Sequence, residues 1–195
     1  RANVHELEEL FELLLERGVR GWQVQLTVAM GRAAEVERLL LEPFQMLELM
    51  PILARVAERA REAAVLLWPG NNVGYFGPYE ALLRGSQPLG HAGSCGAGRS
   101  TIGIESNGDI KGCPSLPTAE YVGGNVRDHT LRDIWERADA LRFTRDRTTR
   151  ELWGFCAGCY YAEECKAGCS WTSHSLFGRR GNNPFCHHRA LELLA

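Results

Sequence analysis

The sequence predicts an α/β segment over residues 1–88, followed by an irregular α+β segment over residues 89–195. Two observations predict this division. Residues 1–68 alternate between helical and strand periodicity, in the order helix, strand, helix, strand. After about residue 70 the long periodic segments end, Gly, Asn and Pro become frequent, and all seven cysteines follow, the first being Cys95.

The first helix and strand are predicted at residues 3–17 and 21–28. Leu7, Phe11 and Leu14 repeat at the spacing of one helix face. Asn3 is expected to cap this helix, with a capping box closed by Glu6, and Gly18 suits its C-terminal end. In the strand, apolar residues alternate with Gln and Thr, so one face is expected to be buried and the other polar.

The second helix and strand are predicted at residues 42–64 and 64–68. Pro51 lies within the helical pattern and is expected to kink or split it. The strand is continuously apolar, which is typical of a buried parallel strand. Two strands do not complete an α/β domain, so we expect a larger sheet whose earlier strands lie upstream of Arg1.

Residues 89–195 contain shorter elements. A β-hairpin is expected over residues 101–112, because Asn107-Gly108 is a preferred pair for a type I′ turn. Thr130 is expected to cap a helix over residues 131–141, with Asp133 at its third position.

The overall composition is that of a globular protein and indicates neither a nucleic-acid partner nor a membrane partner. Hydrophobic residues make up 45% of the 195 residues, charged residues make up 24%, and the formal net charge is −2. No apolar run approaches the roughly 20 residues of a membrane span, and no charge excess suggests nucleic-acid binding. The first residues hold neither a start Met nor a signal-peptide pattern, so we interpret the chain as part of a longer protein.

The cysteines carry the most specific signal. Their spacing is Cys-x12-Gly-x4-Cys, then Cys-x2-Cys-x5-Cys-x3-Cys, then a final Cys, at Cys95, Cys113, Cys156, Cys159, Cys165, Cys169 and Cys186. An odd number fits poorly with a closed disulfide framework. Clustered cysteines in a chain without secretory signals indicate metal instead.

Two kinds of metal site remain open on spacing alone. A zinc ion takes four thiolates, which would leave three cysteines unused. A cuboidal iron–sulfur cluster takes one thiolate per iron, and a three-thiolate cluster with an open iron would use that remainder. Glycines beside the cysteines, such as Gly96, Gly112, Gly158 and Gly168, would let the backbone approach the inorganic sulfides.

The full pattern resembles the SPASM domain, which follows the catalytic barrel in radical SAM peptide and protein maturases. All seven cysteines match the family signature, and the phrases Gly124-Asn125-Val126 and Leu131-Arg132-Asp133-Ile134-Trp135 look similar too. The resemblance covers about residues 89–190. It implies two auxiliary 4Fe-4S clusters: an inner one held by Cys95, Cys113 and Cys169, and an outer one held by Cys156, Cys159, Cys165 and Cys186.

Some members of this family carry an eighth cysteine that completes the inner cluster, and this chain lacks it. The inner cluster is therefore expected to keep one iron open to solvent, substrate or another ligand. His91 and Ser94 lie near enough in sequence to be considered as that ligand. The alternative is that His91 is an ordinary loop histidine.

Residues 1–88 resemble the last units of the partial (β/α)6 barrel of radical SAM enzymes. The family's Cys-x3-Cys-x2-Cys motif, which holds the cluster that cleaves S-adenosylmethionine, is absent, so the fragment alone is not expected to be active. Because ligands bind at the carboxyl ends of parallel strands, Gln25, Thr27, Trp68 and Asn71 are candidate contacts to S-adenosylmethionine. The alternative is that Gln25 and Thr27 only form the polar face of a strand.

Other polar groups have both a functional and a plain interpretation. Arg142, Arg145, Arg147 and Arg150 could grip an acidic peptide, although a solvated linker is the simpler interpretation. His174, His187 and His188 could donate to a cluster sulfide or relay protons, or could simply be packed or surface residues.

The resemblance implies a complete enzyme with a third 4Fe-4S cluster and S-adenosylmethionine. It would abstract hydrogen, through a 5′-deoxyadenosyl radical, from a ribosomally made peptide or a protein side chain, in the cytoplasm. Its partners would be that substrate and an electron donor such as ferredoxin or flavodoxin. The alternative function is a non-catalytic zinc or iron–sulfur module for electron transfer or scaffolding.

Overall fold

The computed structural model describes residues 1–195 and divides them into two compact units. The first unit comprises Arg1–Gly93 together with Asn183–Ala195, and the second comprises Ser94–Asn182. The division after Gly93 lies close to the expected position at residue 88. The return of residues 183–195 to the first unit was not expected, because nothing in their sequence separates them from the cysteine-rich segment before them.

The elements are short outside the first unit. The helices are α1 (Leu7–Glu16), α2 (Met46–Glu62), α3 (Glu80–Arg84), α4 (Thr118–Tyr121), α5 (Leu131–Arg137), α6 (Asp139–Arg142), α7 (Ala162–Cys165), α8 (Ser170–Phe177) and α9 (His187–Glu192). The strands are β1 (Gly21–Val24), β2 (Leu66–Pro69), β3 (Gly103–Ile104), β4 (Asp109–Lys111) and β5 (Val122–Asn125). Single 3-10 turns are η1 (Val4–Glu6), η2 (Gly31–Glu35), η3 (Glu37–Leu39), η4 (Pro43–Gln45), η5 (Thr149–Glu151) and η6 (Gly154–Gly158).

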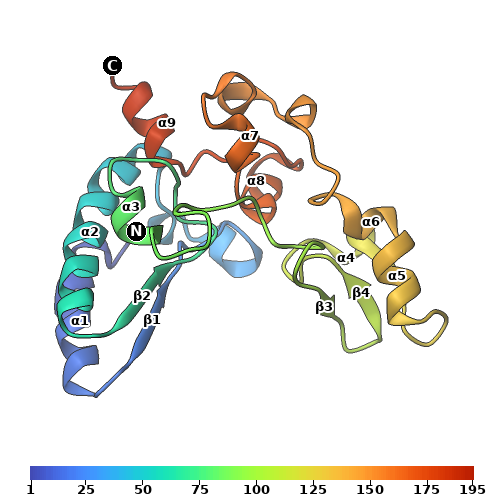
Figure 1. Cartoon of the computed structure of the whole chain (residues 1–195), viewed down its shortest axis with the longest axis horizontal. Helices are drawn as coiled ribbons and strands as arrows, with labels where there is room; N and C mark the ends of the chain where they lie inside the picture. Colours follow the sequence, from blue (N-terminus) through green and yellow to red (C-terminus); the bar gives the residue numbers. More distant parts are fainter. The chain divides into compact units, whose positions relative to one another are not determined.

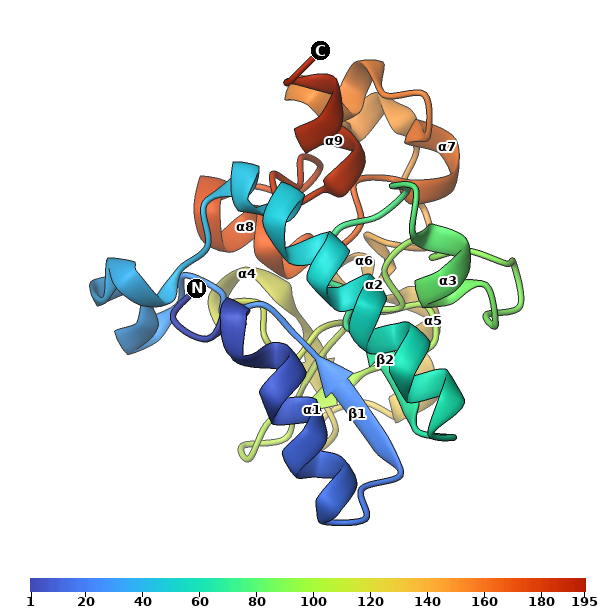
Figure 2. The same ribbon diagram turned by 90° about the vertical axis from the view of Figure 1, so that its left-hand side faces the viewer.

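The first unit is an α/β layer, as the alternation of its elements predicts. β1 and β2 pair in parallel, with Gln23 opposite Trp68. Helices α1 and α2 lie side by side over one face of this pair (Figures 1 and 2). Side chains alternate between the two faces along β1 and the residues after it. Val24 and Leu26 are buried on one face, whereas Gln23 and Gln25 are exposed on the other.

The main core lies between these helices and the strands. Phe11, Met46, Leu53, Val56 and Val73 are each fully buried within it. The opposite face of the sheet is open, with Leu66 61% and Trp68 38% exposed. The expectation of a strand buried on both faces at residues 64–68 is therefore wrong for the described chain, since helices cover only one of its faces.

Helix α1 ends as expected and begins differently. Gly18 has a φ of +69°, and the Gly18 and Val19 N–H groups donate to Leu15 and Leu14 carbonyls, as in a Schellman motif. At the other end Asn3 makes no side-chain cap. The predicted capping box fails because the chain enters through η1, so the Glu6 N–H bonds to the Asn3 carbonyl instead.

Helix α2 continues through Pro51 without a break. Pro51 lies near the start of the helix, where its missing N–H removes only the bond to Leu47. The expected helix starts too early: η4 precedes it, and Phe44 is 64% exposed.

A buried ion pair organises the loop after β2. Arg84 donates to the Val73 and Gly74 carbonyls and, at 2.8 Å, to Glu80. Glu80 accepts in turn from the Ala92 N–H at 2.7 Å. The backbone of Val73, Gly74 and Ala92 is thus tied to α3 by charge-assisted hydrogen bonds.

The second unit is built on an antiparallel sheet with the order β3-β4-β5. The predicted hairpin is present, but its turn is not type I′. The Gly108 N–H donates to the Glu105 carbonyl, and only Gly108 has a positive φ, of +91°. This is the geometry of a type I turn followed by a left-handed residue, and Asn107 instead bonds Asp109 through its side chain.

The predicted helix over residues 131–141 is two helices, α5 and α6. Thr130 accepts from the Asp133 N–H at 3.1 Å, so the predicted N-cap is confirmed. The break lies at Ala138, whose ψ of 112° is extended. Ile134 and Leu141 nevertheless share one small core with Ile110 of β4. None of the helices in either unit has the length and apolar character that crossing a bilayer requires.

Candidate metal centre

Three distant cysteines come together in the second unit. Cys95 lies in the loop before β3, Cys113 follows β4, and Cys169 precedes α8. Cys95 and Cys113 share a hydrophobic cluster, in which Cys95 is 6% exposed. Burial raises the pKa of the Cys113 and Cys169 thiols, and the neighbouring Cys95 raises the pKa of both further. The three are thus electrostatic neighbours although up to 74 positions separate them (169 − 95).

Backbone N–H groups point at two of these sulfurs. Those of Ser115 and Leu116 hydrogen-bond to Cys113, and those of Trp171 and Thr172 bond to Cys169. Each of these bonds lowers the pKa of its thiol, against the effect of burial. Such donors stabilise thiolates and tune iron–sulfur clusters.

A run of left-handed residues separates Cys169 from Cys165. Lys166, Ala167 and Gly168 have φ angles of +47°, +61° and +56°. Cysteines four positions apart would face the same way on a continuous helix. The left-handed run ends α7 after Cys165 and starts α8 after Cys169, which turns the two thiols into different surroundings.

The remaining cysteines are half-buried. Cys156 lies in η6, Cys159 follows it, and Cys165 ends α7. The Tyr161 N–H donates to the Cys159 sulfur at 3.4 Å. Cys186 precedes α9 in the first unit, where its thiol donates to the Tyr75 carbonyl at 3.5 Å.

The thiolates and the N–H groups near them suit an iron–sulfur cluster, and the choice between a cluster and zinc stays a prediction. No three His, Cys, Asp or Glu side chains converge on a position that one metal ion would occupy. A zinc ion needs its thiolates within about 2.3 Å of one point. An iron–sulfur cluster spreads them, one to each iron, and accepts the backbone N–H groups that point at Cys113 and Cys169.

Arg147, one of the four arginines of the predicted basic stretch, is a buried cation beside this group. It is 3% exposed and donates to the Lys166 carbonyl at 2.9 Å and to the Ser170 hydroxyl at 2.7 Å. Burial lowers the pKa of Arg147, and so does Arg180, whereas the nearby Cys95 raises it. The interpretation of this segment as a solvated linker is therefore wrong at Arg147. Nothing in the polar pattern distinguishes Arg147 from its neighbours.

The neighbouring arginines have other partners. Arg142 pairs with Asp146 at 2.7 Å in the exposed part of the segment. Arg145 packs its guanidinium 4.6 Å from the centre of the Trp135 ring. These two residues thus anchor the segment locally.

The candidate S-adenosylmethionine contacts lie where parallel strands end, but they do not form one group. Gln25 and Thr27 line a cavity of about 180 Å³ beyond β1. Trp68 is on the same face of the sheet, opposite Gln23. Asn71 is exposed in the turn after β2. Their role in binding stays a prediction.

Asn72, which was not predicted from the sequence, has a structural role next to the candidate contact Asn71. It is 4% exposed, and its side chain accepts from the Leu26 N–H at 3.2 Å and donates to the Leu26 carbonyl at 2.7 Å. It therefore extends the pairing of the two strands beyond Val24. The sequence shows two adjacent asparagines and no pattern that selects the second.

The candidate histidines all have specific surroundings. His91 packs its ring 5.3 Å from that of Phe76, within the first unit, and Ser94 accepts from Arg99 at 3.1 Å. His174 hydrogen-bonds to the Tyr121 hydroxyl at 3.0 Å. His187 stacks on Tyr79, and His188 lies 3.9 Å from Glu192. Ligation by His91 or Ser94 stays a prediction.

A family model for SPASM, described as an iron–sulfur cluster-binding domain, matches residues 95–160. The match includes the buried pair Cys95 and Cys113 and the pair Cys156 and Cys159. This part of the second unit is thus similar to SPASM domains.

Relatives extend the match to almost the whole chain. The AdoMet-dependent heme synthase of Nitratidesulfovibrio vulgaris is 29% identical over 97% of this chain and 52% of that protein. The mycofactocin maturase MftC of Mycobacterium tuberculosis is 30% identical over 42% of this chain and 22% of that protein. A solved structure, native anSMEcpe with bound AdoMet and Kp18Cys peptide, covers 96% of this chain and 51% of its own, with a TM-score of 0.61 and 15% identity.

The chain is thus similar to radical SAM enzymes, and its second unit is similar to the SPASM domain. It spans about half the length of the relatives that it matches over most of its own length. The likeness to anSMEcpe shows the shared fold across both units.

Proposed function

We propose that this chain is the C-terminal part of a radical SAM maturase whose SPASM domain holds two auxiliary 4Fe-4S clusters. The observation that supports it best is the gathering of Cys95, Cys113 and Cys169, with backbone N–H groups directed at the last two. When bound, such clusters supply one-electron transfer or an open iron for substrate. The residues of this chain hold the thiolates, direct hydrogen bonds to them and exclude water with Phe143 and Leu116.

The proposed substrate is a peptide or protein side chain, from which the complete enzyme abstracts hydrogen. The similarity to MftC, a maturase, and the peptide bound in the anSMEcpe structure support this class. S-adenosylmethionine and a third cluster would act in the complete enzyme, with ferredoxin or flavodoxin as the electron donor.

A second candidate function is suggested by the extent of the other similarity. The heme synthase matches 97% of this chain, whereas MftC matches 42%. That relative is named for making haem, which is not a peptide. Incubating the complete enzyme anaerobically with S-adenosylmethionine and a reductant, with each substrate class in turn, separates the two candidates through mass spectra of the peptide and haem absorbance.

The cluster assignment itself is tested on this chain. After anaerobic reconstitution we expect about eight iron and eight sulfide per chain, as two 4Fe-4S clusters require. Cys169→Ser is expected to remove the inner cluster and Cys159→Ser the outer one, each variant losing about half of the iron. Zinc without sulfide in the purified chain would contradict the proposal.

A further inference from the structure

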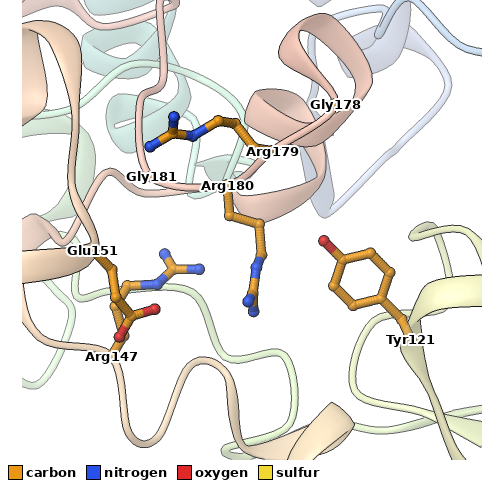
Figure 3. Close-up of a pocket in the computed structure, with 7 residues that line it drawn as sticks. All are labelled: Tyr121, Arg147, Glu151, Gly178, Arg179, Arg180 and Gly181. Carbon is orange, nitrogen blue, oxygen red and sulfur yellow. The ribbon is translucent and has the colours of Figure 1, made fainter.

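A cavity in the second unit carries two arginines that face the same space. Its volume is about 320 Å³, and its lining includes Tyr121, Arg147, Glu151 and Arg180. Figure 3 shows the guanidinium groups of Arg147 and Arg180 and the hydroxyl of Tyr121 directed into it. Arg179 also lines the cavity, but its guanidinium is turned away from the other two and lies 4.4 Å from the centre of the Trp153 ring.

The two arginines are held differently. Arg147 is fixed by its bonds to the Lys166 carbonyl and the Ser170 hydroxyl. Arg180 is held by ring faces, with its guanidinium 4.4 Å from the centre of the Phe143 ring and 5.5 Å from that of Tyr121. Stacking of this kind leaves the edge of the guanidinium available for hydrogen bonds.

One donor of this pair lacks a partner. The Nη1 atom of Arg180 is buried and has no hydrogen-bond acceptor. A buried charged donor without a partner costs free energy, so an acceptor from a ligand would be stabilising there. Neither Arg147 nor Arg180 forms an ion pair with Glu151, although all three line the cavity.

We propose that this cavity, the Arg147–Arg180 cavity, binds a carboxylate group. The planar fork of arginine matches a planar carboxylate through two parallel hydrogen bonds. The charges fit a monoanion better than a phosphate, because Glu151 offsets one of the two arginines directed into the cavity, while the third, Arg179, stacks on Trp153. Tyr121 and Phe143 belong to the same cluster as Cys95 and Cys113, so a bound carboxylate lies in the neighbourhood of the inner cysteine group.

The carboxylate is carried by a peptide, as an acidic side chain or a free C-terminus; this part of the inference rests on the proposed function. Binding of a carboxylate by the cavity is tested separately from binding of a peptide, so either claim can fail without the other. Thermal unfolding of the reconstituted chain is compared in sodium acetate, inorganic phosphate and sodium chloride at equal ionic strength. Acetate is expected to raise Tm above its value in chloride, since a ligand that binds only the folded state stabilises it.

Three variants test which side chains of the cavity determine the acetate shift in Tm. Arg180→Gln is expected to abolish the acetate shift, whereas Arg179→Gln, the same change one residue away, is expected to keep it. Glu151→Gln is expected to enlarge the shift, because it removes the negative charge in the cavity while a Gln still supports the turn that Glu151 caps. Equal losses in the two arginine variants, or a phosphate shift as large as the acetate shift, would overturn the carboxylate assignment.

Fluorescence anisotropy then identifies the carrier. One labelled hexapeptide has a single Glu and an amidated end, a second has a free C-terminus and no acidic side chain, and a third has Gln and an amidated end. We expect one of the first two to bind at least about tenfold more tightly than the third, with this preference lost in Arg180→Gln. If acetate stabilises the chain but all three peptides bind equally, the carboxylate site stands and the peptide assignment is overturned.

Discussion

At the scale of single residues, Asn72 holds together the ends of two parallel strands. Its side-chain amide satisfies both the N–H and the carbonyl of Leu26, in a region that is almost without solvent exposure. This is the edge of the sheet where ligands bind in α/β proteins. A structural side chain thus shapes the edge at which Gln25 and Thr27 lie.

Replacing Asn72 with Ala should lower the free energy of unfolding by about 2–4 kcal/mol, because two buried backbone groups lose their partners. Urea denaturation measures this loss. Asn71→Ala is the matched control, since Asn71 is exposed and only its backbone carbonyl accepts a bond, from Tyr75. Equal effects of the two changes would show that the Asn72 bonds contribute little.

Glu80 is the second residue on which the first unit depends. It is 8% exposed and faces Arg84, which is 2% exposed. Glu80→Ala would leave this arginine buried without its counter-charge, so we expect a loss of about 3–5 kcal/mol in the free energy of unfolding. Chemical denaturation would reveal it, and Glu58→Ala, an exposed change on α2, should stay within about 0.5 kcal/mol of the parent.

At the scale of elements, sequence patterns predicted what local interactions determine. The Schellman end of α1 at Gly18 and the N-cap at Thr130 depend on neighbours in sequence, and both are confirmed. The capping box at Asn3 and the split at Pro51 were wrong because η1 and the position of Pro51 near the start of α2 changed the local geometry. The break at Ala138 follows from the fit of Leu141 to a distant core, which periodicity does not contain.

The N-cap of α5 allows a direct test at this scale. Thr130→Ala removes the acceptor for the Asp133 N–H, so the free energy of unfolding should fall by about 1 kcal/mol. Thr130→Ser keeps the hydroxyl and should change it by only a few tenths of that. Thermal and urea unfolding of the two variants provide the comparison, and an equal loss in both would contradict the cap.

At the scale of the whole molecule, the sequence indicates some residues of the candidate site but not the tertiary contacts of others. The cysteines could be proposed as ligands from the sequence because a cluster requires sulfur at fixed spacings, and their ligation stays a prediction. The burial of Arg147 and the stacking of Arg180 on Phe143 could not be predicted, because arginine is common in polar segments and only the fold creates these surroundings. The return of residues 183–195 to the first unit is likewise a tertiary property.

The two units differ in what should stabilise them. The first has a continuous apolar core around α2, whereas the second divides its buried residues between two small clusters, one of which includes Cys95 and Cys113. Metal binding contributes to folding wherever the ligands are brought together only in the folded state. We therefore expect the second unit to depend on its clusters more strongly than the first.

Removing iron with a chelator and an oxidant should reveal this difference. Hydrogen exchange followed by mass spectrometry should show a loss of protection around residues 95–113 and 165–172, where thiolates and N–H donors surround the inner site. Protection in α2, residues 46–62, should change little, because its fully buried residues pack in the first unit without any thiolate ligand of the inner group. A uniform loss of protection over both regions would show instead that the two units unfold as one cooperative body, and unchanged exchange around Cys95 would show that the thiol group is stable without metal.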